Sequence, residues 1–377
     1  MTKKSENKDI KVSIIMSLFN VELYMRTAIE SVLNQTLKDI ELICINDGST
    51  DYSLDIAKEY AKKDERVKVL SYEESKGQAY ARNRGIDIAK GRYIGFVDGD
   101  DWVEAAMFEK LYNEAEKNRT EVTFCAAALY DDQTGKTIWN NDYYNLYLIP
   151  KEFDNRVFTH EETKNLLTGC LNVALWNKIY RTDFLNKNKI RFPEYYIYED
   201  MPFFYETWFK SENICLIRDC CYYYRINRQS STMSRMGSKV LDRVDMVALT
   251  YEMFKELPYF DEIKTQVTTW IIEDLFHRYT IVEGRYRREF FFLMKKMFKN
   301  LDLDGVDKEK LENCYYYNEY KNCVNLKFPE FLITLADTYI RAKKRENQLQ
   351  SQILSEKYQT QLRYEEIIKN MQNMQPQ

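Results

Sequence analysis

The sequence has few of the residues that build zinc sites. Its 377 residues include only two histidines, His160 and His277, and its eight cysteines form no Cys-x-x-Cys pair. Because zinc sites use such ligands at short spacing, a zinc centre is disfavoured. We interpret the cysteines as reduced, mostly buried thiols of a cytoplasmic protein. The adjacent pair Cys220-Cys221 fits the two faces of a strand better than a redox centre.

Long apolar runs and an excess of basic charge are also missing. No stretch approaches the roughly 18–20 apolar residues that cross a bilayer. The polar segment Met1 to Asp9 lacks the apolar core of a signal peptide. The net charge is −4 at pH 7, which gives no indication of nucleic acid as a partner. We therefore expect a globular protein of the cytoplasm.

Two glycine-rich nucleotide motifs are absent. No Gly-x-Gly-x-x-Gly follows the first predicted strand, and no Gly-Lys-Ser/Thr loop occurs anywhere. Their absence argues against a dinucleotide-dependent dehydrogenase and against a P-loop NTPase. A nucleotide bound here would be held by carboxylates and a metal ion more than by a glycine-rich loop.

The first hundred residues alternate between short apolar stretches and stretches with helical spacing. The predicted strands are 12–18, 40–46, 67–72 and 93–98, and the predicted helices are 21–35, 53–63 and 78–89. This alternation predicts an α/β fold with a mostly parallel sheet flanked by helices. Ligands of such sheets bind beyond the carboxyl ends of the strands.

The pattern changes along the rest of the chain. A helix at 105–118 and a strand at 121–130 precede a loop-rich segment, 131–160. A helix that opens at 198–201 and strands at 214–218 and 220–226 follow. Helical spacing from about residue 238 predicts a helical module, and we interpret 331–377 either as a long helix with weak coiled-coil character or as a frayed tail.

One acidic segment stands out at the end of the fourth predicted strand. Asp98, Asp100 and Asp101 follow the apolar run that begins at Tyr93, and Trp102 ends the segment. Carboxylates this close repel one another, so a bound cation or hydrogen-bonding ligand would stabilise them. A solvated acidic turn is the alternative, since Asp and Gly are ordinary turn residues.

Several motifs in order resemble those of a family 2 glycosyltransferase with the GT-A fold, of the type that builds bacterial surface glycans. The motifs are Ser13–Asn20, Asn46–Asp51, Gly77–Gly85, Val97–Trp102, Leu175–Lys178, Tyr198–Phe203 and Tyr223–Ser231. The resemblance covers about Lys11 to Ser231. It implies a GT-A domain at 11–235, which divides into a nucleotide-sugar half, 11–110, and an acceptor half, 111–235. From composition and helical spacing we expect a flexible start at 1–10, a helical module at 236–330, and a helical or partly disordered tail at 331–377.

The resemblance assigns residues to the donor nucleotide. Asp47 would accept a hydrogen bond from the imide of the base, which favours uracil because that base offers one N–H there. Helix capping is the other role open to Asp47. Ser17 and Phe19 would surround the base with Glu22 nearby, and Gly77 would allow close approach of the backbone.

Three further residues are implied near the diphosphate. Arg82 would touch phosphate or hold Asp98 in place, with a structural ion pair as the alternative. Arg225 and Ser230 match a segment that closes over the diphosphate in this family. Gln229 stands where the family usually has glycine, so the turn before Ser230 departs from the pattern.

The acidic segment is assigned to the metal by the same resemblance. Asp98 would reach the ribose or the metal, Asp100 would ligate the metal, and Asp101 would orient the other two. Mn²⁺ or Mg²⁺ fits these oxygen ligands, with diphosphate and water completing the shell. Such an ion acts as a Lewis acid on the leaving group.

The acceptor side is assigned to two motifs. Asp200 occupies the position of the catalytic base, and Glu199 would bind the acceptor or hold Asp200 in place. The alternative is that both carboxylates only favour the start of the helix that follows. Trp176 would stack on the acceptor sugar or pack in the core, and Lys178 would support the carboxylates.

The resemblance therefore implies a metal-dependent inverting hexosyltransferase. It would move a sugar from a UDP-sugar to a hydroxyl of a glycan or lipid-linked glycan, in surface polysaccharide or lipooligosaccharide synthesis. The stretch 328–345 is a candidate for peripheral contact with the inner face of the membrane, and the C-terminal helices are candidates for a homodimer contact. The alternatives are a catalytically silent scaffold and a nucleotidyltransferase, the latter opposed by the lack of a basic, glycine-rich loop after the first strand.

Overall fold

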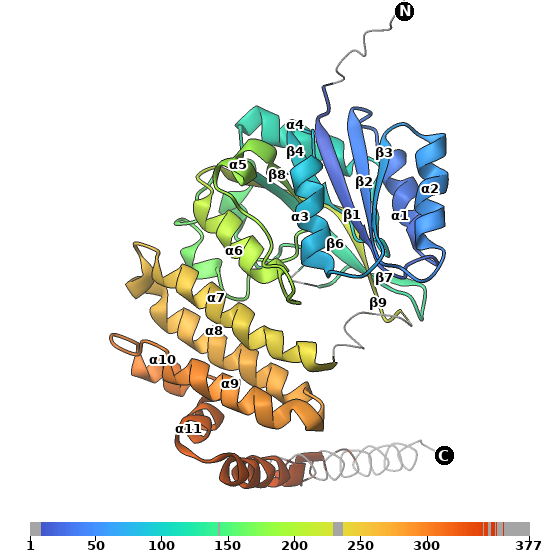
Figure 1. Ribbon diagram of the computed structural model, residues 1–377. Coiled ribbons are helices and arrows are strands. Elements are labelled where there is room, and N and C mark those ends of the chain that lie inside the picture. Colours follow the sequence, from blue (N-terminus) through green and yellow to red (C-terminus); the bar gives the residue numbers. More distant parts are fainter. Residues whose placement is uncertain are drawn as a thin grey trace, which may run out of the picture. The chain divides into compact units, whose positions relative to one another are not determined.

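The computed structural model describes residues 9–141, 144–228, 237–341, 343–345, 348–350, 352 and 357 (Figure 1). Two compact units divide the chain, Met1–Cys314 and Tyr315–Gln377. The first unit contains the sheet and all the predicted site residues that the structure describes. The domain boundaries inferred from the sequence stay predictions.

Four parallel strands form the first half of the sheet. They are β1 (Val12–Leu18), β2 (Ile40–Asp47), β3 (Val67–Tyr72) and β4 (Tyr93–Phe96), in the order β3-β2-β1-β4. The connecting helices are α1 (Met25–Leu33), α2 (Ser53–Lys63) and α3 (Gln78–Ile88). The predicted α/β alternation is confirmed, and α1 is shorter than the predicted helix because 22–24 form a turn.

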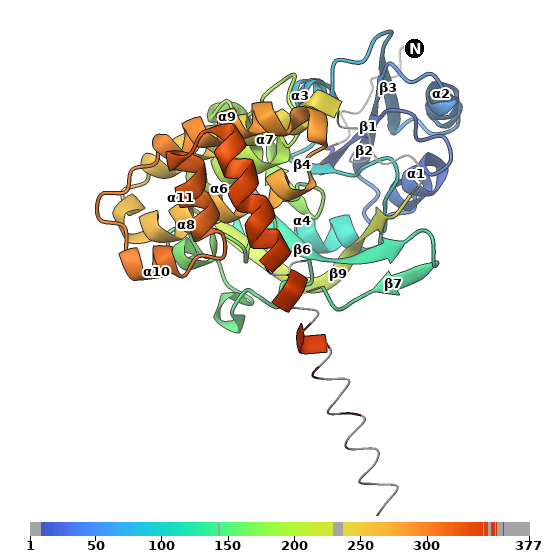
Figure 2. The same cartoon turned by 90° about the horizontal axis from the view of Figure 1, so that it is seen from below.

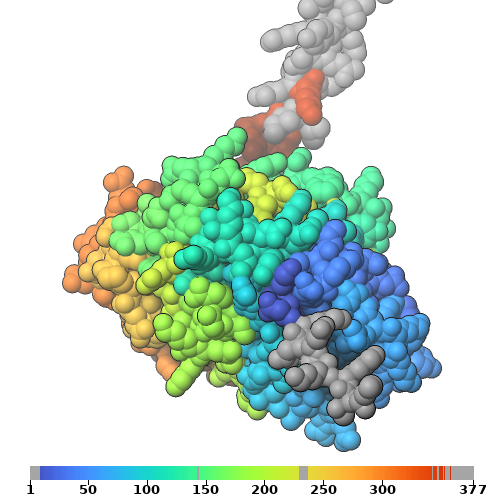
Figure 3. Space-filling view, turned by 90° about the horizontal axis from the view of Figure 1, so that it is seen from above, coloured from blue at the N-terminus to red at the C-terminus, as the bar shows by residue number. Residues whose placement is uncertain are grey.

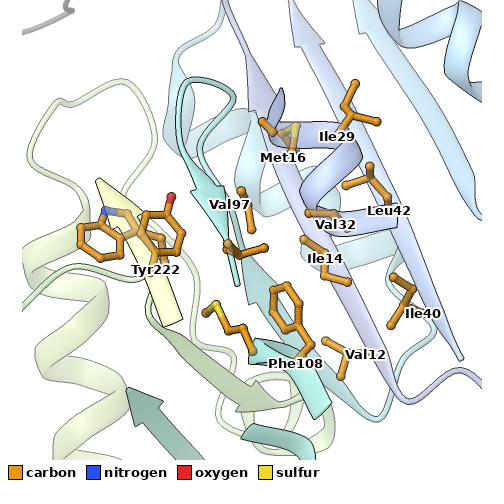
Figure 4. Close-up of a cluster of buried hydrophobic side chains, with 14 of the residues drawn as sticks. Val12, Ile14, Met16, Ile29, Val32, Ile40, Leu42, Val97, Phe108 and Tyr222 are labelled. Atoms are coloured by element: carbon orange, nitrogen blue, oxygen red, sulfur yellow. The ribbon is translucent and has the colours of Figure 1, made fainter. Parts of the chain in front are cut away.

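Buried apolar side chains hold this half together. Every residue of β2 is buried, as expected for a strand that is covered on both faces. Figure 4 shows Ile14 and Met16 of β1 beside Ile29 and Val32 of α1 in one hydrophobic cluster. Burial on both faces fixes the strands, and with them the position of the loops at their carboxyl ends.

Five more strands extend the sheet and make it mixed. They are β5 (Trp102–Val103), β6 (Val122–Asp131), β7 (Lys136–Ile138), β8 (Lys178–Arg181) and β9 (Ile214–Ile226). The full order is β3-β2-β1-β4-β8-β6-β9-β5, with β7 paired to β6. β8 runs antiparallel to β4 and β6, while β9 runs parallel to β6 and antiparallel to β5. The segment 131–160, predicted as a loop, contains β7.

Helices cover both faces of the sheet. The second half adds α4 (Met107–Asn118), α5 (Thr182–Lys187) and α6 (Asp200–Lys210). Figures 1 and 2 show α3 on one face and α1 and α4 on the other. Figure 3 shows the surface on this side of the molecule, where the teal residues of the α4 region adjoin the blue N-terminal segments.

A helical module completes the first unit. Its helices are α7 (Asp242–Lys255), α8 (Phe260–Ile281), α9 (Arg287–Lys299) and α10 (Lys308–Glu312), with short 3₁₀ turns η4 (Gly237–Leu241) and η5 (Gly284–Tyr286). The predicted helical spacing is confirmed, and α7 packs beside α6 (Figures 1 and 2). The module therefore adjoins the helix that begins at Asp200.

The second unit is helical where the structure describes it. It contains α11 (Tyr317–Asn325) and a helical stretch, 328–341. Among the described residues, no helix is long and apolar enough to span a bilayer. All eight cysteines are free thiols, six of them buried.

Candidate active site

The candidate site lies where the parallel strands end. Asp47 ends β2, Asp98 follows β4, and Ser17 and Phe19 lie at the end of β1. The parallel pairing of β1 with β2 and β4 brings these ends to one edge of the sheet. This is the edge at which α/β proteins bind their ligands.

Asp47 organises the loop that leads into α3. Its Oδ1 accepts from the backbone N–H of Lys76 at 2.8 Å, and its Oδ2 accepts from Ser75 Oγ at 2.6 Å and from Gly77 N–H at 2.9 Å. Gly77 has a φ of +95°, a conformation that glycine adopts without strain. Three of about four acceptor positions of the carboxylate are filled, which leaves one for a donor on a ligand.

The loop after β1 contributes an exposed ring and a polar network. Phe19 is half exposed, and Ser17 Oγ accepts from Gln78 Nε2 at 3.3 Å. Glu22 Oε2 accepts from the backbone N–H of Tyr52 at 2.8 Å. Glu22 thus ties this loop to the start of α2, while Phe19 remains open to a ligand.

Arg82 joins the two predicted groups of carboxylates. From α3, its Nη2 donates to Asp98 Oδ1 at 2.9 Å and its Nη1 donates to Glu199 Oε1 at 2.7 Å. The side chains of Arg82 and Glu199 are only 5% and 7% exposed. The metal motif and the base motif, a hundred residues apart in sequence, therefore meet at one guanidinium.

Asp100 has an arginine partner that the sequence analysis did not assign. Arg228, which follows β9, forms an ion pair through Nε with Asp100 Oδ2. Burial raises the pKa of Asp100, and the charge of Arg228 opposes this. The only sequence signal for Arg228 is its place three residues after Arg225, and that spacing does not identify a contact with Asp100.

Asp101 is buried and anchors the acidic turn to β9. Its Oδ2 accepts from Tyr222 Oη at 2.7 Å, and its Oδ1 accepts from Arg225 N–H at 2.7 Å. Tyr222 Oη also accepts from the backbone N–H of Asp98 at 3.2 Å. Tyr222 was not predicted, because it lies within a run of tyrosines that gives no indication of which ring faces the turn.

The side chain of Arg225 contacts the acidic turn and is surrounded by aromatic side chains. Its Nε donates to the carbonyl oxygen of Asp100 at 2.8 Å, and its Nη1 donates to Asp132 Oδ1 at 2.5 Å. The guanidinium lies about 5 Å from the ring centres of Tyr24, Trp102 and Tyr130. These contacts give Arg225 a role in holding the turn. Ser230, predicted beside it, lies outside the described residues.

The predicted base motif begins α6. Asp200 Oδ1 accepts from the backbone N–H of Met201 at 2.9 Å. Burial raises the pKa of Asp200, against the charges of Arg82 and Arg243. Burial likewise raises the pKa of Glu199 to about 7, although Arg82 lowers it. Carboxylates whose pKa values are raised in this way are suited to proton transfer.

The two predicted acceptor residues are buried. Trp176 stacks on Tyr222 with ring centres 4.2 Å apart and packs against Tyr144 and Tyr224, so its position is one of core packing. Lys178 Nζ donates to the carbonyl oxygens of Asn172 and Ala174 and to Asn177 Oδ1. Burial lowers the pKa of Lys178 to about 7. Neither side chain is exposed enough for the structure to support direct contact with an acceptor.

The acidic turn suits a hard divalent cation in part. Within the described ranges, no group of three or more His, Cys, Asp or Glu side chains forms a complete metal site. Asp98 and Asp100 supply carboxylate oxygens, and each is balanced by an arginine in this structure. An ion held here would take its remaining ligands from a bound molecule and water.

Known proteins of similar sequence include glycosyltransferases. The model of glycosyl transferase family 2 matches residues 13–188. The putative glycosyltransferase EpsH of Bacillus subtilis is 33% identical over 265 residues, which cover 69% of this chain and 74% of EpsH. Poly(ribitol-phosphate) beta-glucosyltransferase of Bacillus spizizenii is 31% identical over 229 residues, 60% of this chain and 34% of that protein.

A solved structure extends the similarity beyond the matched domain. S. aureus TarS, residues 1–349 in complex with UDP-GlcNAc, superposes with a TM-score of 0.68 over 88% of this chain and 92% of that one, at 18% identity. This likeness shows the GT-A fold together with a C-terminal helical region. The match to the family model and the similarity to EpsH show that the chain belongs to glycosyl transferase family 2.

Proposed function

We propose that the protein is a metal-dependent, inverting hexosyltransferase that uses a UDP-sugar. The observation that carries the proposal is the bridge from Asp98 through Arg82 to Glu199, since it joins a donor-side carboxylate to the base motif. The UDP-GlcNAc complex of the structural neighbour supports the choice of nucleotide. The poly(ribitol-phosphate) beta-glucosyltransferase among the relatives supports an acceptor from surface polysaccharide synthesis.

The donor would lie along the carboxyl edge of the sheet. The free acceptor position of Asp47 is suited to the imide N–H of uracil, and the exposed ring of Phe19 offers an apolar contact to the base. Gly77 would allow the diphosphate to approach the start of α3, where backbone N–H groups favour negative charge.

The charge of the leaving group needs compensation. Asp98 and Asp100 would hold Mn²⁺ or Mg²⁺, which would stabilise the negative charge of the departing diphosphate as a Lewis acid. Arg228 forms an ion pair with Asp100 and would add a second positive charge near the diphosphate.

The acceptor hydroxyl needs a base. Asp200 would take its proton as the new bond forms between the acceptor oxygen and the anomeric carbon and the bond to the diphosphate oxygen breaks. One base and one displacement imply inversion of configuration at that carbon. Glu199, held by Arg82, would keep the position of Asp200 fixed.

The test measures UDP release from a panel of UDP-sugars, with GDP- and dTDP-sugars as comparison, in Mn²⁺ and with a chelator. Release from a UDP-sugar should require the metal and should fall by about 10²-fold or more in Asp100→Ala and Asp200→Asn. Asp183→Asn, on the exposed side of α5, is the control and should match the wild type. Equal release by all variants would reject the assignment.

A further inference from the structure

We propose that Arg243 of α7 is a positioning residue for the Asp200 base, so that the helical module completes the active site. The inference rests on the proposed function. It concerns a part of the chain that lies beyond the segment matched by the family model, 13–188.

The segment that leads to the base has an unusual backbone. Tyr195 has a φ of +75° and Tyr198 a φ of +65°. Bulky residues rarely adopt this left-handed conformation, and they keep it only where the surroundings fix it. Tyr198 immediately precedes Glu199 and Asp200, so what holds Tyr198 also sets the direction in which the base motif enters α6.

The start of the helical module supplies the contacts that hold this segment. Lys239 Nζ donates to the carbonyl oxygen of Tyr195 at 2.6 Å, and Ile197 N–H donates to Asp242 Oδ2 at 3.0 Å. The segment is therefore attached at two places to η4 and the first turn of α7. Both contacts involve its backbone, which is the part that bears the strain.

Two arginines of the module flank the Tyr198 ring. The guanidiniums of Arg243 and Arg278 each lie 5.1 Å from the ring centre. Arg243 is itself fixed by a two-point ion pair with Asp274 of α8, in which Nε donates to Oδ2 at 2.8 Å and Nη2 pairs with Oδ1. A planar guanidinium held at two points cannot turn away from the ring.

The charge of Arg243 also acts on Asp200. Burial raises the pKa of Asp200, and Arg82 and Arg243 lower it. The charged and titratable groups that act on Asp200 from the packed elements are Arg82, Asp98, Lys178, Glu199 and Arg243. The phenols of Tyr180, Tyr198 and Tyr224 also interact with Asp200. Arg243 is the member that the helical module supplies.

The experiment compares Arg243→Gln and Arg243→Lys in the full chain, with Arg285→Gln, an exposed arginine of η5, as the matched control. UDP affinity, measured by calorimetry, should change less than twofold in all three. For Arg243→Gln, kcat should fall at least tenfold and the acidic limb of the pH–rate profile should move to higher pH, because a positive charge near the base is lost. Arg243→Lys should retain most of the kcat and the wild-type limb.

Asp274→Asn tests the same arrangement, and it should shift the acidic limb of the pH–rate profile in the opposite direction. It leaves the charge of Arg243 without its partner, so the acidic limb should move to lower pH. This variant decides the matter if Arg243→Gln does not fold. The inference alone would be overturned if Arg243→Gln kept the wild-type kcat and pH–rate profile. It would also be overturned if the acidic limb of that profile moved in the same direction in Arg243→Gln and in Asp274→Asn. No UDP release by the wild type would reject the proposed function and this inference with it.

Discussion

Single carboxylates decide how the site responds to pH. Burial raises the pKa of Glu199 to about 7, so this group takes up a proton as the pH falls below neutral, and burial also raises the pKa of Asp200. We expect kcat/KM for UDP release to rise between pH 6 and pH 8. Glu199→Gln removes a negative charge beside Asp200, so its acidic limb should lie at lower pH than that of the wild type. If the acidic limb of this variant lay at the same pH as that of the wild type, or at a higher pH, the charge of Glu199 would not act on Asp200.

Arg228 balances the charge of Asp100 in the ligand-free structure. A divalent cation on Asp100 must therefore compete with a guanidinium. Arg228→Gln should bind Mn²⁺ roughly fivefold more tightly in the absence of donor, which corresponds to about 1 kcal/mol. Electron paramagnetic resonance of free Mn²⁺ measures this directly. Arg156→Gln, which breaks an exposed ion pair with Glu162, serves as the control; unchanged affinity in Arg228→Gln would exclude competition.

The resemblance to family 2 glycosyltransferases was needed to indicate Asp47, Asp98, Asp100 and Asp200 as one site, because each carboxylate taken alone also fits a turn or the start of a helix. In the structure Asp47 and Asp98 lie at one edge of the sheet, and Arg82 joins Asp98 to Glu199, the neighbour of Asp200. The partners Arg228 and Tyr222 could not be predicted, because their contacts with Asp100 and Asp101 span more than a hundred residues. Nothing local in the sequence records the pairing of β5 with β9 that creates those contacts.

The close packing of α4 on the sheet depends on Gly95 of β4. A Cβ atom at Gly95 would lie 2.6 Å from Cε1 of Phe108, so the ring of α4 sits directly on the strand. Gly95→Ala should lower the free energy of unfolding by about 1–3 kcal/mol, since the buried ring has little room to move. Denaturant unfolding measures the change. Gly284→Ala, with no atom within 4 Å of its added Cβ, should stay within about 0.5 kcal/mol of the wild type.

Helices and strands whose apolar residues recur at regular spacing could be predicted from the sequence, and those without such spacing could not. The predicted bounds of β1, α2 and β3 coincide with the structure because their apolar residues alternate or recur without interruption. β8 begins with Lys178 and ends with Arg181, so it does not resemble a buried strand. β9 was split in two at Asp219, where its register with β6 shifts.

At the scale of the whole molecule, the first unit holds every described site residue. A chain ending at Cys314 should therefore fold and release UDP at a rate within about twofold of the full chain, since no side chain of the candidate site is removed. Thermal unfolding and UDP release test this. Loss of both would show that residues 315–377 are needed for the fold. Light scattering of the two chains would test the predicted homodimer contact through the C-terminal helices.

The contacts of Tyr198 with the helical module have a consequence for how such enzymes diversify. If Lys239, Arg243 and Asp274 hold the base, a module taken from a relative can replace this one only when it brings equivalent side chains. Recombination at the junction after β9 would then yield inactive chimaeras unless Tyr198 and its partners were inherited together. Acceptor preference would evolve more readily in the loops of the sheet domain than by exchange of whole modules.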